Sequence, residues 1–153
     1  MLFAIFLLGL LNLLTITSST PAVLSQEKRS KSTIICCRDT NQPWWYGDDP
    51  AIQKGIDTLK DRPGSCAVAA GPRVCTDLTC DDKHKIQLCN DNTYAIEPTC
   101  SYLATYAEDI MEKCSEPGDP TIGTPSVSCG QQFDTDNYNV IIMKNIDGEC
   151  TGR

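Results

Sequence analysis

The chain has 153 residues, and its 13 lysines and arginines against 20 aspartates and glutamates give a formal net charge of −7 at pH 7. Such an acidic chain is repelled by phosphate backbones and by anionic lipid headgroups, which argues against nucleic acid or an anionic membrane surface as its partner. The single histidine, His84, excludes an acid–base pair of two histidines.

The first segment of the chain is apolar. Among residues 1–16 only Asn12 and Thr15 are polar, and no charged side chain precedes Glu27. The apolar run is too short and too interrupted to span a bilayer, which takes about 20 apolar residues. We therefore predict a signal peptide over residues 1–25, secretion to the extracellular space and no membrane anchor.

A dibasic pair, Lys28-Arg29, follows the apolar segment. It is either a site for a processing protease or simply two solvated charges in a flexible N-terminus. We predict that residues 26–32 form such a propeptide or flexible segment, and that residues 33–153 form one domain.

All ten cysteines follow residue 35. Cysteines at this density persist as disulfides only outside the reducing cytosol, and their even number predicts five disulfides of undetermined connectivity. The predicted set is Cys36, Cys37, Cys66, Cys75, Cys80, Cys89, Cys100, Cys114, Cys129 and Cys150.

Two pairs of cysteines are limited by local geometry. Cys36 and Cys37 are adjacent, and neighbouring side chains of a strand point to opposite faces, so we expect them to have different partners. Cys100 and Cys114 bracket a predicted helix, whose rise separates them by about 21 Å, beyond disulfide reach. They fall on nearly the same helical face, so we expect both to tether that helix to the rest of the domain.

The predicted elements alternate between strands and helices. Residues 32–37 read as a strand, and residues 41–49 as a loop. A helix is predicted from Asp49-Pro50, with Asp49 as a cap and with Ile52, Ile56 and Leu59 in one apolar stripe.

The second half continues the alternation. Strands are predicted over residues 65–70 and 138–143, the latter central, and residues 74–79 and 85–90 together form one further extended region around a polar turn. A helix capped by Thr99 or Ser101 is predicted to run to about Lys113, followed by a loop over residues 115–127. The order β-α-β-β-α-β predicts an α+β fold: a small disulfide-rich sandwich in which two helices pack on one face of an antiparallel sheet.

Complete catalytic sets are absent from the pattern. His84 lies between two lysines in a polar segment and reads as a solvated turn histidine. Carboxylate pairs such as Asp134 and Asp136 could cleave glycosidic bonds if they faced each other across a cleft, or bind calcium, but they fit a turn more simply. We predict that the protein is not an enzyme and has no catalytic residues, cofactor or metal.

An aromatic cluster, Trp44-Trp45-Tyr46, lies in the loop at residues 41–49. Aromatic side chains supply large, rigid contact area, so these three residues are candidates for stacking on sugars or for inserting into a partner's pocket. The alternative is that at least one tryptophan covers the core. Loops 38–49 and 115–128 are the predicted contact regions.

Several segments carry a resemblance to a known group of proteins. They are Leu78 to Asn92, with the distinctive Cys89-Asn90-Asp91-Asn92, then Cys100 to Cys114, Gly130 to Phe133 and Asn137 to Ile141. Together they resemble small cysteine-rich proteins secreted by filamentous fungi, many of them candidate effectors. The predicted architecture is also similar to the α/β sandwich of killer toxins encoded by viruses of smut fungi.

This resemblance implies a secreted fungal effector that binds a host plant protein or cell-surface component, promoting infection or modulating immunity. We expect it to act as a monomer. Two other functions stay open: a killer-toxin-like or cell-death-inducing protein, and a secreted hydrolase that uses carboxylates. A protease inhibitor would be a variant of the first.

Overall fold

The computed structural model describes residues 30–41, 43–81 and 83–150. The predicted signal peptide and the Lys28-Arg29 pair lie outside the described residues. The folded domain includes residues before 33, because β1 begins at Lys31 and the Ser30 hydroxyl donates to the Asp134 carboxylate. Residues 30–32 thus lie in the folded domain and not in the predicted propeptide or flexible segment.

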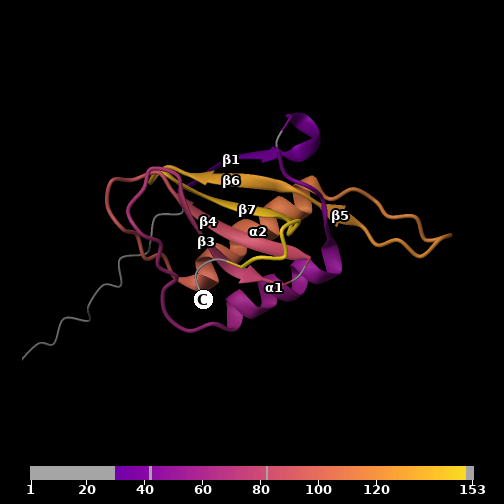
Figure 1. Cartoon of the computed structure of the whole chain (residues 1–153), viewed down its shortest axis with the longest axis horizontal. Coiled ribbons are helices and arrows are strands. Elements are labelled where there is room, and N and C mark those ends of the chain that lie inside the picture. The colour runs from indigo at the N-terminus through magenta and orange to yellow at the C-terminus, as the bar shows by residue number, and fades with distance from the viewer. Residues whose placement is uncertain (1–29, 42, 82, 151–153) are drawn as a thin grey trace, which may run out of the picture.

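One antiparallel sheet of five strands organises the domain, in the order β1-β6-β7-β4-β3 (Figure 1). Its strands are β1 (Lys31–Cys36), β3 (Val74–Cys80), β4 (His84–Asn90), β6 (Gly130–Asp134) and β7 (Tyr138–Lys144). A small second sheet pairs β2 (Gly47–Asp48) with β5 (Val127–Ser128). The short 3-10 helix η1 is Cys37–Asp39.

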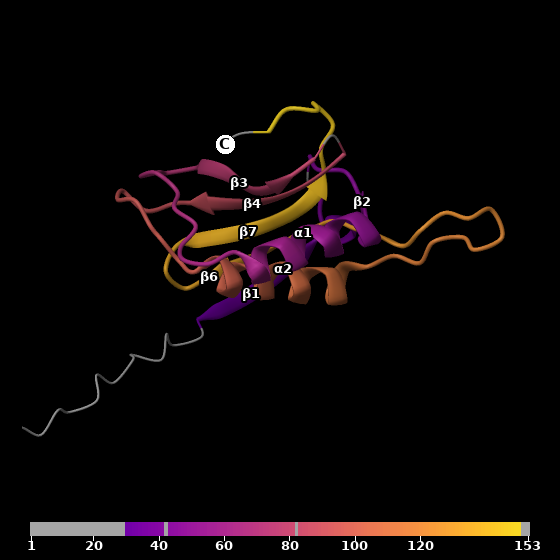
Figure 2. The same ribbon diagram turned by 90° about the horizontal axis from the view of Figure 1, so that it is seen from below.

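Two helices, α1 (Asp49–Asp61) and α2 (Cys100–Cys114), pack side by side on one face of the large sheet (Figure 2). Their buried residues meet alternate side chains of the strands, because successive residues of a strand face opposite sides. From β4 and β7 these core residues are Ile86, Leu88, Val140 and Ile142. The fold class is therefore the predicted α+β sandwich.

Strand β7 occupies the centre of the sheet, as predicted, and its residues Tyr138 to Met143 are all buried. Residues 138, 140 and 142 face the helices, whereas Ile141 and Met143 form a smaller apolar cluster with Cys89 on the opposite face. Trp44, which is partly buried, packs against this cluster on the second face.

All ten cysteines are paired, in the disulfides Cys36–Cys114, Cys37–Cys129, Cys66–Cys100, Cys75–Cys89 and Cys80–Cys150. The adjacent Cys36 and Cys37 have different partners, as expected. Cys100 and Cys114 tether the two ends of α2 to Cys66 and Cys36, which confirms their predicted role.

Two local predictions are wrong, and one strand was not predicted. Residues 65–70 make only isolated bridges, Ser65 to Thr99 and Val68 to Ile96, and no strand of the sheet. Strand β6 was missed because its sequence, Gly-Gln-Gln-Phe-Asp, lacks the β-branched residues that usually mark a strand. Asp49 is the first residue of α1 rather than its cap, and its side chain bonds elsewhere.

Candidate binding site

A long loop projects from the body of the domain between α2 and β6 (Figures 1 and 2). It comprises residues 115–128, called the clamped loop below, and ends in the two residues of β5. It corresponds to one of the two predicted contact regions. What the sequence did not predict is how tightly its two ends are held.

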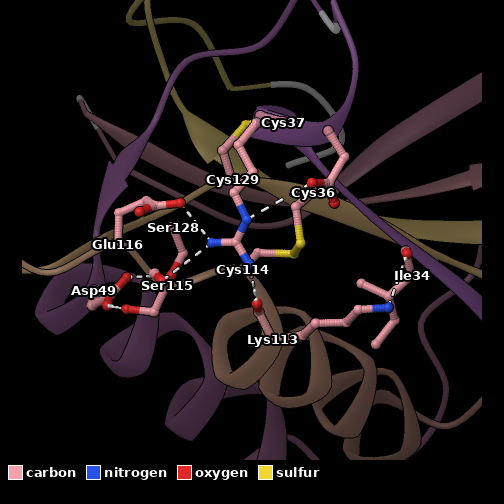
Figure 3. Close-up of a disulfide and its surroundings, with 12 residues drawn as sticks. Ile34, Cys36, Cys37, Asp49, Lys113, Cys114, Ser115, Glu116, Ser128 and Cys129 are labelled. Carbon is pink, nitrogen blue, oxygen red and sulfur yellow. Dashed lines mark hydrogen bonds and ion pairs between the residues drawn. A yellow bond between two sulfur atoms is a disulfide. The ribbon is translucent and has the colours of Figure 1, made fainter.

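Both ends of the clamped loop are fixed by disulfides to two consecutive residues. Cys114, just before the loop, is bonded to Cys36, and Cys129, just after it, is bonded to Cys37 (Figure 3). The backbone adds to this closure, because the Cys37 N–H donates to the Cys129 carbonyl at 3.0 Å. The adjacent cysteines of β1 and η1 thus bring the loop's two ends together.

The carboxylate of Asp49 links Ser115 and Ser128, the loop residues next to the two cysteines that flank the loop. The hydroxyl groups of Ser115 and Ser128 each donate to a different oxygen of Asp49, at 2.5 Å (Figure 3). Hydrogen bonds to an ionised acceptor are among the stronger ones in proteins. The first residue of α1 therefore holds both ends of the loop, and the pairing of β2 with β5 fixes the same region through the backbone.

Arg38 binds the first arm of the clamped loop, the one that follows α2. Its guanidinium donates to the Lys113 carbonyl at 2.8 Å and to the Glu116 carboxylate at 2.5 Å. The hydrogen bond with Glu116 raises the pKa of Arg38 above its ordinary value. Lys113 in turn donates to the Ile34 carbonyl at 3.4 Å, so the end of α2 is also tied to β1 (Figure 3).

The two arms of the loop lie against each other. Glu116 and Val127 exchange backbone hydrogen bonds of 2.8 and 3.0 Å. Further out, the arms approach so closely that a Cβ on Gly118 would lie 2.2 Å from the Thr124 carbonyl oxygen. Only glycine fits at such a backbone crossing. The loop is therefore a narrow finger rather than an open coil.

The tip is organised around Asp119. Its carboxylate accepts hydrogen bonds from the N–H and the hydroxyl of Thr121, at 2.8 and 2.5 Å. Its N–H donates to the Thr124 hydroxyl at 2.8 Å, and its carbonyl accepts from the Thr124 N–H at 3.0 Å. The bonds from Thr121 hold the pKa of Asp119 below its ordinary value.

Ile122 stands at the end of this turn with 74% of its surface exposed. Pro117, Pro120 and Pro125 limit the backbone on either side of it. The loop contains two acidic residues, Glu116 and Asp119, and no basic one. It thus presents an apolar side chain on a stiff, acidic projection, which is suited to insertion into a partner's pocket.

The three predicted aromatic residues have different surroundings. Trp44 is half-buried and packs on the cluster of Cys89, Ile141 and Met143, so the prediction that one tryptophan covers apolar residues holds for this side chain. Trp45 is 62% exposed, whereas Tyr46 is half-buried. The three side chains therefore do not form one exposed surface.

The prediction of a solvated His84 is wrong. The imidazole is 7% exposed and packs against Gly47, so closely that a Cβ on Gly47 would lie 2.9 Å from the ring. His84 is in register with Ile86 and Leu88 and therefore faces the helices, which the neighbouring lysines concealed in the sequence. Its nitrogens lie 3.6 Å from Asp48 and 3.4 Å from Asp81.

The carboxylates considered for catalysis have structural partners. Asp134 is buried and accepts hydrogen bonds from Tyr106, from Ser30 at 2.8 Å and from the Asp136 N–H at 2.7 Å. Burial and the bond with Asp134 raise the pKa of Tyr106, whose hydroxyl also contacts Tyr138. Asp134 thus anchors the turn before β7, as its simpler interpretation predicted.

A cavity of about 430 Å³ lies between α1 and β3, with Asp77, Asp81 and His84 in its lining. Asp77 accepts a hydrogen bond from Gln87 at 2.7 Å, and Asp81 accepts the backbone N–H groups of Lys83 and His84. The one metal-capable group found among the described residues is Asp77, Cys80 and Cys150, and its two sulfurs are joined as a disulfide.

No helix among the described residues is long and apolar enough to cross a membrane. Comparisons with protein-family models, with curated proteins and with solved structures found no match to this chain.

Proposed function

We propose that this is a secreted, cysteine-rich, effector-like protein that acts by binding a host protein or cell-surface component through the clamped loop, rather than by catalysis. The observation that carries the proposal is the loop itself. Its ends are fixed by two disulfides and by Asp49, and its tip exposes Ile122.

Preorganisation is the physical reason for assigning binding to this loop. A flexible loop loses conformational entropy when a partner orders it, and rigidifying the bound conformation in advance reduces that cost. The arms and tip of the clamped loop are already joined by hydrogen bonds among Glu116, Asp119, Thr124 and Val127. Ordering this segment on binding would therefore cost little.

The chemistry of the loop suggests the kind of partner. Ile122 needs an apolar pocket, and the carboxylates of Glu116 and Asp119 favour a basic rim around it. The backbone at Asp119 forms a turn, whereas a protease cleft pairs with an extended strand. The loop therefore fits a pocket on a partner's surface better than the active-site cleft of a protease.

A leaf infiltration assay tests the function. Protein purified from the medium of cells expressing the full chain would be infiltrated in oxidised form, with a reduced and alkylated sample as control. We expect cell death or a changed immune output from the oxidised form alone, because reduction releases both ends of the clamped loop.

A loop variant and a matched control separate the clamped loop from the rest of the surface. Ile122→Asp is expected to lose most of the response, whereas Tyr94→Ala, which alters another exposed apolar residue, 62% exposed, should retain it. A response that survives both Ile122→Asp and reduction would overturn the assignment to this loop. No response to the oxidised protein in any of several plant hosts would overturn the host-directed function.

A further inference from the structure

A second, smaller hollow lies away from the clamped loop, on the face of the sheet that the helices leave open. Its volume is about 240 Å³. Met143 of β7 forms a buried part of the lining, and Trp44, Trp45 and Ile146 contribute apolar walls. Pockets for drug-sized ligands are generally larger, from about 300 Å³, so this one suits a single small ring.

The aromatic part of this pocket is held in place from below. Trp44 packs on the apolar cluster that includes Met143 and Ile141. The backbone of the next residue is fixed to the sheet, since the Lys144 N–H donates to the Trp45 carbonyl at 2.8 Å. Trp45 thus remains 62% exposed on a fixed backbone, and Ile146, beside it in the lining, is equally exposed.

The polar part of the lining comes from Lys85 and Gln87 of β4, with Lys144 and Asp147 at the end of β7. Lys85 and Gln87 are two residues apart on β4, so both side chains face this open side of the sheet, whereas Lys144 pairs with His84 and shares its helix-facing side. Of the two lysines in the lining, Lys85 therefore presents its ammonium group to this pocket, in a chain whose formal net charge is −7. The amide of Gln87 already donates to Asp77 at 2.7 Å, which fixes its orientation toward the strand beside it.

We propose that this pocket binds a pyranose ring that carries a carboxylate, as in the hexuronate units of acidic oligosaccharides. The C–H face of such a ring stacks on an indole, and its carboxylate pairs with Lys85. Gln87 and Asp147 then form hydrogen bonds with the ring hydroxyls. The inference does not rest on the clamped loop, because the two sites share no residue.

Calorimetric titration with trigalacturonate, and with the neutral cellotriose as a second probe, tests the inference on the full-chain secreted protein. We expect saturable binding of trigalacturonate that weakens as salt is added, since added ions screen Lys85. Cellotriose should bind more weakly, because it offers stacking without a carboxylate.

Variants assign the binding to this pocket. Trp45→Ala should weaken trigalacturonate binding about tenfold through lost stacking. Lys85→Gln should weaken it about threefold, with a smaller salt dependence. Tyr94→Ala is the matched control, since its ring is as exposed as Trp45 but lies outside the pocket lining, and it should bind as the parent does.

Three results would overturn the inference. They are the absence of trigalacturonate binding, equal affinity for both oligosaccharides, and equal losses in Trp45→Ala and Tyr94→Ala. Chemical shift changes in a trigalacturonate titration monitored by NMR provide a second measurement. They should centre on Trp45, Lys85 and Gln87, and changes confined to other surfaces would also contradict the site.

Discussion

The clamped loop and the aromatic segment around Trp44 both connect to the Cys36-Cys37 pair, yet they are held by different forces. The clamped loop is fixed at both ends by covalent bonds and by Asp49, and none of its residues before Ser128 is fully buried. The aromatic segment is bonded covalently only at Cys37, and is otherwise held by packing of Trp44 on the sheet and by the hydrogen bond from the Lys144 N–H to the Trp45 carbonyl.

This difference decides which side chains are available to a partner. A segment held by packing has to bury an apolar side chain, as Trp44 does, and only its neighbour Trp45 remains exposed. A segment held by cross-links and hydrogen bonds can expose its apolar residue, as Ile122 is exposed. In the clamped loop, disulfides therefore take the place of a hydrophobic core, rather than adding stability to a core that already exists.

The largest expected effect comes from opening the clamp. The double variant Cys37→Ser/Cys129→Ser should lose about 2–4 kcal/mol of unfolding free energy, because this disulfide closes a long stretch of chain. Chemical denaturation measures that loss. Hydrogen exchange should also speed up at the amides of Glu116 and Val127, which pair the arms of the loop.

Removal of a distant disulfide is the control for that variant. Cys75–Cys89 links β3 to β4, away from the clamped loop. Cys75→Ser/Cys89→Ser should lower global stability as well, but leave the relative protection of Glu116 and Val127 unchanged. Equal exchange at these amides in both variants would contradict the role of Cys37–Cys129 as a local clamp.

The next effect should come from Asp49→Ala, which removes the acceptor shared by Ser115 and Ser128. We expect a loss of about 2 kcal/mol, within the range for hydrogen bonds to charged groups. Asp57→Ala changes an exposed carboxylate on the same helix and should cost less than about 0.5 kcal/mol. If denaturation midpoints shift equally in the two variants, Asp49 does not hold the loop.

How far the sequence predicts this molecule depends on whether a feature is periodic. The stripe Ile52, Ile56 and Leu59 predicted the buried face of α1, and the run at Val140 predicted β7 as the central strand of the sheet. Spacing also showed that Cys100 and Cys114 tether α2 without pairing with each other.

The clamp could not be predicted in the same way. Disulfide partners, and the convergence of Ser115 and Ser128 on Asp49, depend on tertiary contacts between residues far apart in the chain. A signal was present, since two adjacent cysteines and two cysteines flanking a Pro- and Gly-rich segment invite such pairing. His84 was misjudged because its charged neighbours concealed its register on β4.

A smaller effect distinguishes the two tryptophans. Trp44→Ala should cost about 1–3 kcal/mol, less than a fully buried aromatic residue, because it is half-buried on Met143 and Cys89. Trp45→Ala should change stability by less than about 0.5 kcal/mol. Thermal and chemical denaturation check both values, and a large loss in Trp45→Ala would show that the aromatic segment is not held by Trp44.

The smallest effect concerns pH at the tip of the clamped loop. The folded pKa of Asp119 lies below its ordinary value of 3.8, chiefly because Thr121 donates to the carboxylate. Ionised Asp119 therefore stabilises the turn above pH 3.8, and that stabilisation is lost as the pH falls through the folded pKa. The NMR shifts of Thr121 and Ile122 should follow this titration, and should not do so in Asp119→Asn.

Backbone ¹⁵N relaxation of Thr121, Ile122, Gly123 and Thr124 in the free protein tests the central claim most directly, namely that the clamp holds the loop in one conformation without a partner. The account predicts order parameters close to those of α2 and β7, about 0.8 or higher. Order parameters below about 0.6 at these residues would contradict it, since they would show a flexible loop that only a partner could order.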